Sequence, residues 1–187
     1  MKKFLSLYFI FIILLIVSSY GNNSDDYKMQ PGDVLQISVL NEEDLSRELR
    51  VSSAGNINVP LLGEVNIRNL TSFEITNKLT KLFNEYLVNP QVTIFVVTFA
   101  KVFISGEVKK PGAYELSKPL TIMESITIAG GFSEHANKKK VKLIRKIDGV
   151  KETRVIDISS FINKGNIHDE DVVLKPGDLV IVPESFL

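Results

Sequence analysis

The sequence predicts an α+β protein built from two small β-rich units, each with one main amphipathic helix. Short segments with the two-residue alternation of half-buried strands recur along the chain. Glycine and proline separate these segments at close intervals, as turns require. Only two segments join a strong helical start signal to helical spacing of apolar residues. We place the boundary between the two units near Ala100–Lys101.

The first residues have the pattern of an export signal. Lys2 and Lys3 precede the apolar run Phe4–Val17, which is shorter than the roughly 20 residues that a membrane span needs. The small residues Ser19 and Gly21 then offer a cleavage site. We predict a signal peptide over residues 1–21 cut after Gly21, with Ser19 as the alternative site. An uncleaved inner-membrane anchor is the other possibility for this segment.

The charge and cysteine counts exclude several classes of protein. The chain has 22 Lys+Arg, 22 Asp+Glu and no cysteine. Loss of Lys2 and Lys3 with the signal would leave a weakly acidic mature chain of charge −2. A nucleic-acid-binding protein needs a basic surface, and we therefore expect no nucleic-acid partner. Without cysteine there is no disulfide, thiolate metal site or cysteine nucleophile, so the core must be held by packing alone.

Strand patterns account for most of the chain after the signal. In the first unit, Val34–Leu40 and Gly55–Val59 alternate as half-buried strands do. Val92–Phe99 is β-branched or aromatic at almost every position, which predicts a central strand of a sheet. Shorter segments predict the strands of the second unit: Val102–Ile104, Ala113–Leu116, Val141–Ile144, Arg154–Ile158 and Leu179–Val182.

The first helix is predicted by its start. Thr71 and Glu74 have the spacing of a capping box, in which each side chain hydrogen-bonds to the backbone of the other. Leu70 and Ile75 have the spacing of a hydrophobic staple across the same turn. Apolar residues at helical spacing continue from there, which predicts a helix running to about Leu87.

A second capping box starts the other main helix. Thr121 and Glu124 repeat the spacing, and the helix is predicted over Ile122–Ala129. Gly130 would end it in a left-handed conformation. A weaker pattern suggests a third, short helix over Ser159–Asn163, closed by Gly165.

Two Pro-Gly-Asp sequences predict turns at the starts of strands. They end at Asp33 and Asp178 and form a faint internal repeat. Proline fixes the first corner of such a turn, glycine supplies the positive φ of the second, and aspartate accepts nearby backbone amides. We therefore interpret both aspartates as structural rather than catalytic. Pro111 and Gly112 are interpreted in the same way, as a hairpin connection.

Other groups carry little chemistry. Gly130 and Gly131 close a helix, whereas a phosphate-binding loop opens one. Lys138–Lys140 fits a solvated loop, with contact to an anionic polymer or lipid headgroup as the alternative. His135 and His168 lack a partner motif, and Asp169–Asp171 beside His168 is the one local metal candidate. We predict no catalytic residue, no metal and no cofactor.

The order of the motifs carries a resemblance to a known family. The first half contains Tyr27 followed by Pro31-Gly32-Asp33, then Gly55 to Val65 with Pro60 and Gly63, then Tyr86 to Val92 with Asn89 and Pro90. This succession resembles the bacterial polysaccharide-export protein family. The second half contains Gly106 to Tyr114, Ala129-Gly130-Gly131, Arg145 and Leu174 to Pro183. It resembles the soluble-ligand-binding β-grasp (SLBB) domain that accompanies that family.

The resemblance implies a division into an export domain over residues 22–100 and a β-grasp domain over residues 101–187. It also implies that the motif residues shape structural turns rather than a reaction centre. These are Pro31, Gly32, Asp33, Pro60, Gly63, Asn89, Pro90, Gly106, Pro111, Gly112, Gly130, Gly131, Pro176, Gly177 and Asp178.

The function that the resemblance implies is non-enzymatic export of capsular polysaccharide or exopolysaccharide. Family members look like ring-forming proteins around a wide cavity, so we expect a homo-oligomeric ring with weak contacts to its cargo. We expect it in the periplasm, associated with the outer membrane.

Two departures from longer family members shape the expected partners. The chain lacks their N-terminal lipobox cysteine, and after Glu184–Leu187 it has neither a second β-grasp repeat nor their C-terminal amphipathic helix. We therefore expect a short member that docks on a separate outer-membrane barrel, an inner-membrane chain-length regulator, or both. The alternatives are a monomeric periplasmic module that binds glycans or other ligands, and a secreted polysaccharide-cleaving enzyme.

Overall fold

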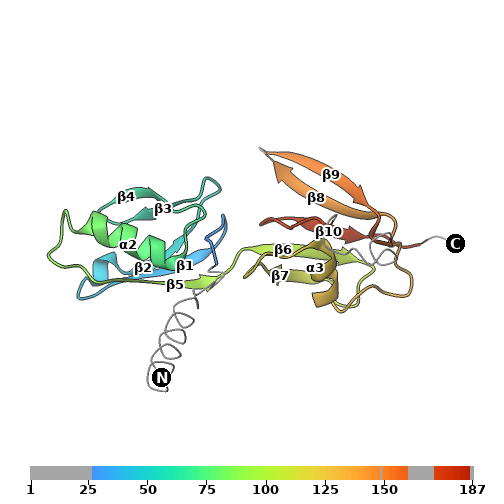
Figure 1. Cartoon of the computed structure of the whole chain (residues 1–187), viewed down its shortest axis with the longest axis horizontal. Helices are drawn as coiled ribbons and strands as arrows, with labels where there is room; N and C mark the ends of the chain where they lie inside the picture. Colours follow the sequence, from blue (N-terminus) through green and yellow to red (C-terminus); the bar gives the residue numbers. More distant parts are fainter. Residues whose placement is uncertain (1–26, 148, 160–170, 186–187) are drawn as a thin grey trace, which may run out of the picture.

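The computed structural model describes residues 27–147, 149–159 and 171–185. Two lobes are joined where β5 (Val92–Thr98) runs into β6 (Lys101–Gly106) (Figure 1). Each lobe has its own cluster of buried apolar side chains, and each contains one main helix. The predicted α+β class is therefore confirmed. The predicted signal with its cleavage at Gly21, His168, and residues 160–165 of the predicted third helix lie outside the described residues.

In the first lobe, two small sheets and α2 (Ser72–Phe83) pack around one core. One sheet has the order β2-β1-β5, and both of its strand pairs are antiparallel. The other is a two-stranded antiparallel sheet of β3 and β4. The remaining elements of this lobe are β1 (Val34–Val39), η1 (Glu43–Leu45), β2 (Arg47–Arg50), β3 (Asn56–Val59) and β4 (Gly63–Asn66).

Helix α2 begins as the sequence predicts and ends earlier. The Thr71 hydroxyl accepts the Glu74 amide at 3.2 Å, and the Glu74 carboxylate accepts the Thr71 amide at 2.8 Å. These bonds lower the pKa of Glu74 below its ordinary value. The predicted end at about Leu87 is wrong, because the helix ends at Phe83. The Tyr86 and Leu87 amides both bond to the Phe83 carbonyl in a final turn that does not continue as helix, and Leu87 packs against the core.

The position of β5 also differs from the prediction. It is an edge strand of its sheet, with β1 as its one strand partner among the described residues. Val92 and Ile94 face the core, while Phe95 and Val97 face outward and are 62% and 51% exposed. An apolar pattern on both faces of a strand predicts that both faces are buried, but a neighbouring strand is only one of the elements that can bury them. The covering need not come from the same lobe.

The second lobe is a five-stranded sheet with the order β7-β6-β10-β8-β9. Its first and last strands, β6 and β10, are parallel neighbours, and the other pairs are antiparallel. This is the β-grasp arrangement. The strands not yet defined are β7 (Gly112–Glu115), β8 (Val141–Ile147), β9 (Val150–Ile156) and β10 (Leu179–Val182).

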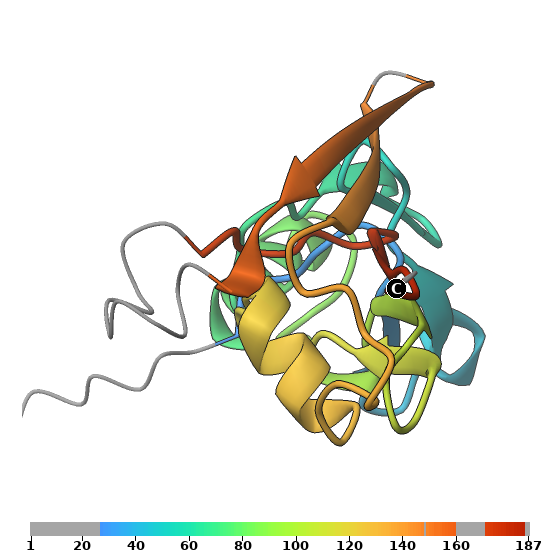
Figure 2. The same ribbon diagram turned by 90° about the vertical axis from the view of Figure 1, so that its right-hand side faces the viewer.

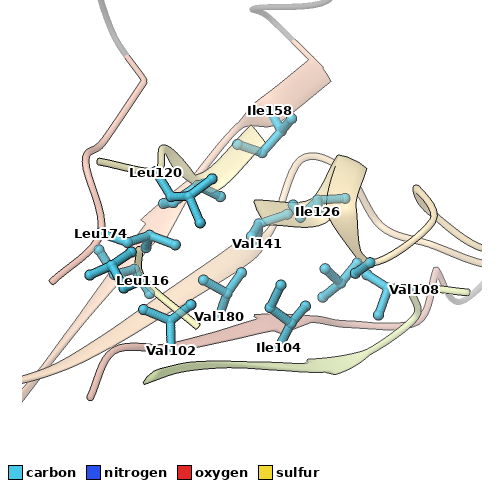
Figure 3. Packing of buried hydrophobic residues seen from close by; sticks show 14 residues of the cluster. Val102, Ile104, Val108, Leu116, Leu120, Ile126, Val141, Ile158, Leu174 and Val180 are labelled. Atoms are coloured by element: carbon cyan, nitrogen blue, oxygen red, sulfur yellow. The ribbon is translucent and has the colours of Figure 1, made fainter. Parts of the chain in front are cut away.

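Helix α3 (Ile122–Ile128) covers one face of this sheet (Figure 2). Its Ile122 and Ile126 are buried against sheet residues that include Val102 and Val180 (Figure 3 shows part of this core). The predicted capping box is present at its start. At its end the Gly130 amide bonds to the Thr127 carbonyl and the Gly131 amide to the Ile126 carbonyl, both glycines having positive φ. This is the Schellman termination that ends many helices.

Candidate functional site

The two Pro-Gly-Asp sequences fold into the same corner. Gly32 and Gly177 have φ of +98° and +82°, which L side chains rarely adopt. Asp33 and Asp178 are 0% and 1% exposed, and each carboxylate accepts the amide three residues before it, at 2.8 and 2.7 Å. A strand starts immediately after each corner. Both carboxylates are therefore held in place by hydrogen bonds to the backbone and are not free acids.

Asp33 also connects the first lobe to the linker. Its Oδ1 accepts the amide of Ala100 at 2.7 Å, and the Tyr27 hydroxyl donates to the same carboxylate at 2.8 and 2.9 Å. Burial, followed by the hydrogen bond to Asp33, raises the pKa of Tyr27 well above its ordinary value. Tyr27 therefore stays protonated and keeps its donor role. Its ring meets Phe99 edge-on, with centroids 4.9 Å apart.

Asp178 has a charged partner instead. Arg145 on β8 donates to it from Nε at 2.9 Å and from Nη2 at 2.6 Å. The same Nη2 reaches the carbonyl of Val173 at 3.0 Å. Hydrogen bonding to Asp178 raises the pKa of Arg145, so the guanidinium charge is permanent. The pair ties the start of β10 to the neighbouring strand β8.

The other predicted motif residues lie at turns or strand ends. Gly106 ends β6 next to β10, where an added Cβ would lie 2.1 Å from the carbonyl oxygen of Val182. Only glycine therefore fits this position. The rest occupy the β3–β4 turn (Pro60, with Gly63 as the first residue of β4), the loop before β5 (Asn89, Pro90), the β6–β7 connection (Pro111, with Gly112 starting β7), the end of α3 (Gly130, Gly131) and the corners (Pro31, Pro176).

The sheet face of the second lobe that is opposite α3 forms a groove of about 830 Å³. The strand registers place one row of residues across all five strands: Ala113, Phe103, Leu179, Ile144 and Thr153. Phe103 is 45% exposed on this floor. Lys146 and Lys151 lie directly opposite each other on the β8–β9 hairpin and line the same groove. The hairpin extends beyond the end of its pairing with β10 (Figure 1).

A second, smaller cavity of about 320 Å³ lies in the first lobe. It is lined by the β1–β2 loop and the loop from α2 to β5, which lie at the end of this lobe away from the linker (Figure 1). Asn41 and Asn89, one in each loop, have φ of +63° and +51°. Val88 at this end is 94% exposed. The left-handed asparagines show that both loops are held in defined, strained conformations.

The described members of the predicted histidine and metal candidates, His135 and Asp171, lie outside helices and strands. His135 is exposed in a loop, where its backbone carbonyl accepts the Ser185 amide. Residues 27–147, 149–159 and 171–185 contain no cluster of His, Asp and Glu suited to a metal ion. Asp171, the described member of the predicted metal candidate, points its carboxylate to the Met123 amide at 3.3 and 3.4 Å. Within the same residues, no helix has the length and apolar character needed to cross a membrane.

Comparison with known families matches both lobes. Residues 21–97 match the model of the polysaccharide biosynthesis/export protein family. The chain belongs to this family. Residues 100–182 match the SLBB domain, so the export domain is followed by an SLBB domain whose sheet order is that of a β-grasp. The resemblance inferred from the sequence is confirmed for the family and for both domains.

Curated relatives of this family member are named for the export, production or transport of polysaccharides. The chain is 28% identical over 136 residues to the EPS I polysaccharide export outer membrane protein EpsA of Ralstonia solanacearum, covering 71% of this chain and 35% of EpsA. It is 21% identical over 182 residues to the exopolysaccharide production protein ExoF of Rhizobium meliloti, covering 87% and 43%. It is 26% identical over 110 residues to the polysialic acid transport protein KpsD of Escherichia coli, covering 57% and 20%. The chain thus spans about a third of the length of its Ralstonia relative.

Sequence reasoning missed the residues of the groove. Phe103, Lys146 and Lys151 carry no motif, and only the pairing of β6, β10, β8 and β9 brings them to one face. The signal that could have identified them is strand parity. In β6, Val102 and Ile104 are buried, so Phe103 must face the other way.

Proposed function

We propose that this family member is a non-enzymatic, periplasmic subunit of a polysaccharide export machine, associated with the outer membrane. In this role it forms part of a ring-shaped conduit for capsular polysaccharide or exopolysaccharide. The observation that carries the proposal is the succession of an export domain and an SLBB domain in one chain, each with its own core. The relatives named for polysaccharide export and transport support it.

The buried carboxylates support a role without catalysis. Asp33 and Asp178 are the two buried acids among the described residues, and hydrogen bonds occupy both oxygens of each. A general acid or base must be free to exchange a proton with a substrate. Acids fixed in this way hold a backbone in place instead.

The edge of β5, which no strand of the described residues covers, supports self-association. The strand has no charge, proline or glycine from Val92 to Thr98, and its outward residues Phe95 and Val97 are exposed. Native proteins usually protect an edge of this kind with charge, proline or a covering element. A second copy that covers β5 with a different surface of its own would give a head-to-tail contact, and such contacts close into rings when the rotation allows.

The remaining partners follow from the proposed role. The exported polymer should be held weakly, because a conduit must release its cargo as readily as it admits it. We further infer docking on a separate outer-membrane barrel, an inner-membrane chain-length regulator, or both. N-terminal sequencing of the protein from fractionated envelopes would show whether it is cut after Gly21.

Deletion of the gene tests the export role. We expect surface polysaccharide to disappear and to return when the intact chain is supplied. Unchanged surface polysaccharide in a strain without a second copy of the gene would refute the proposal.

Cross-linking in intact cells tests the ring. We expect a ladder of multimers from the intact chain and its loss from a Phe95→Lys/Val97→Lys variant. Phe73→Lys is the matched control, because Phe73 is also exposed, at 69%, but lies on α2. Monomers alone from the intact chain would favour the monomeric glycan-binding alternative.

A further inference from the structure

The groove on the β-grasp sheet carries two like charges with no described counter-charge. Lys146 and Lys151 are directly opposite residues of the antiparallel β8–β9 pair, and both line the groove. Like charges at such positions destabilise a hairpin. Neither lysine forms an ion pair with a described acid, and the hairpin residue Asp148 lies outside the described residues. The molecule therefore keeps a locally unfavourable arrangement at the edge of a groove.

More positive charge lies on the same face. Lys142 pairs in register with Ile181, one row below Ile144 and Leu179, and Lys101 precedes Phe103 by two residues on β6. By strand parity both lysines face the groove side of the sheet. Glu115, opposite Lys101, is the one acid among the strand residues on that face. The face thus has a net positive charge, although the mature chain is predicted to be weakly acidic.

The floor of the groove is apolar and its backbone is already paired. Phe103, Leu179 and Ile144 come from β6, β10 and β8, which are the three interior strands of the sheet. Interior strands have no free row of amides and carbonyls, so an extended peptide cannot add a strand there. A ligand on this floor contacts side chains only. The aromatic face of Phe103 suits the apolar face of a sugar ring, as aromatic side chains suit other flat apolar surfaces.

The cations also fit a weakly held ligand. Lysine carries a compact, strongly hydrated charge on a flexible side chain. It cannot form the bidentate hydrogen bonds with which arginine binds carboxylate or phosphate. Exposed charge contacts of this kind contribute little each and are screened by salt. Two lysines beside an apolar strip therefore favour fast, reversible contact with a carboxylated sugar.

We propose that the outer face of the β-grasp sheet is a binding site for a carboxylate-bearing polysaccharide, whose acid groups contact Lys146 and Lys151 and whose sugar rings lie on Phe103. This proposal rests on the proposed export function and extends it, because it names the face that meets the cargo and the charge of the cargo. The row from Ala113 to Thr153 crosses four strand spacings, about 19 Å, which accommodates a short run of sugar rings.

Binding of defined oligomers to the purified full chain tests the proposal. The probes are an oligogalacturonate, its methyl ester, which lacks the charge, and an oligoglutamate of equal charge. Amide chemical shifts measured by NMR should move on titration with oligogalacturonate, and mainly on β6, β8, β9 and β10. We expect little change with either other probe. Equal binding of the ester would remove the role of charge, and equal binding of oligoglutamate would make the occupant an acidic peptide; either result overturns the proposal.

Matched variants locate the site. Lys146→Gln/Lys151→Gln should weaken oligogalacturonate binding about five- to tenfold, as expected for the loss of two exposed charge contacts. Lys81→Gln/Lys118→Gln removes the same charge from exposed residues outside the groove and should leave binding unchanged. Phe103→Ser should weaken binding at any salt concentration, whereas the lysine effect should fade as salt increases. Equal losses in the two lysine variants would overturn the site.

Stability provides a second readout. Because Lys146→Gln/Lys151→Gln relieves a like-charge pair, its melting temperature should equal or exceed that of the unmodified chain while its binding falls. A lower melting temperature would mean that the lysines serve the fold, against the proposal. These measurements use purified protein, so they stand apart from the gene deletion. Binding without loss of export on deletion would refute the export role alone, and export without binding would refute this site alone.

Discussion

The two Pro-Gly-Asp corners use one turn for two different connections. In both, a buried aspartate accepts the amide three residues earlier, and a glycine of positive φ precedes it. The other hydrogen bonds that the Asp33 carboxylate accepts come from neutral donors, the Tyr27 hydroxyl and the Ala100 amide. Asp178 uses a guanidinium, that of Arg145. The local turn is thus encoded in three residues, whereas its role in the lobe depends on which donor the fold brings to it.

The donors decide what each corner holds together. Ala100 lies in the linker after β5, so Asp33 fixes the point where the chain leaves the first lobe. The amide of Leu116 in the second lobe in turn bonds to the Ala100 carbonyl, at 2.7 Å. Asp178 acts inside the second lobe, between β10 and β8. We therefore expect the first corner to matter for both lobes and the second for one.

Asp33→Ala should have the largest effect of the changes considered for these corners. It leaves the Ala100 and Gln30 amides and the Tyr27 hydroxyl without their acceptor in a buried or half-buried site. Orphaned buried donors cost about 1–3 kcal/mol each, so we expect a loss of about 3–5 kcal/mol in the free energy of unfolding. Urea unfolding followed by circular dichroism measures it.

Hydrogen exchange then locates the effect of Asp33→Ala. Amides of β1 and β5 should lose protection, and amides at the start of β6 should lose part of theirs. A change of less than 1 kcal/mol, or exchange unaltered across the linker, would contradict the connecting role of Asp33.

Asp178→Ala should cost less, about 2–3 kcal/mol. Removing one partner of a buried ion pair strands the other charge. The Arg145 side chain, however, is 16% exposed and keeps its bond to the Val173 carbonyl, so water and that carbonyl offset part of the loss. Protection should fall in β8 and β10 and persist in β1 and β5.

The variant Arg145→Met/Asp178→Asn separates charge from packing in this pair. It removes both charges and keeps similar volumes, and it should recover part of the stability that Asp178→Ala loses. A double variant less stable than Asp178→Ala would show that the guanidinium contributes through partners other than Asp178, and the contrast with Asp33 would then fail.

Local signals made parts of this fold predictable. The capping boxes at Thr71 and Thr121 and the positive φ of Gly130 depend on neighbours within a few residues, and all three are present. The pairing of β5 depends on residues far along the chain, which is why its edge position was missed. β2 was missed for another reason: the sequence Arg-Glu-Leu-Arg has three charges and reads as a loop. It is a solvent-exposed edge strand, where charge is compatible with pairing.

The candidate site shows the same division. The turn residues could be predicted because each turn needs glycine, proline or aspartate at a fixed place. The groove could not, because Phe103 and Lys146 are 43 positions apart in the numbering and meet only through the register of β6, β10 and β8. The partners of Asp33 and Asp178 outside their own turns were unpredictable for the same reason.

Gly32→Ala and Gly177→Ala test the part of the comparison that should not differ. Both glycines have positive φ, and left-handed backbone costs an L residue about 1–2 kcal/mol. An added Cβ at Gly32 would be 3.5 Å from the Ala100 Cβ, an ordinary contact, and at Gly177 it would meet nothing within 4 Å. We therefore expect equal losses of about 1–2 kcal/mol in urea unfolding, whatever the partner of the neighbouring aspartate.

Gly112→Ala is the matched control for these glycine variants. Gly112 starts β7 without positive φ, and an added Cβ would meet nothing within 4 Å, so its loss should be near zero. If Gly32→Ala cost far more than Gly177→Ala, strain in the first corner would be passing into the linker through Ala100. Asp33 would then be one part of a wider junction rather than its single anchor, and the two corners would differ in their backbones as well as in their donors.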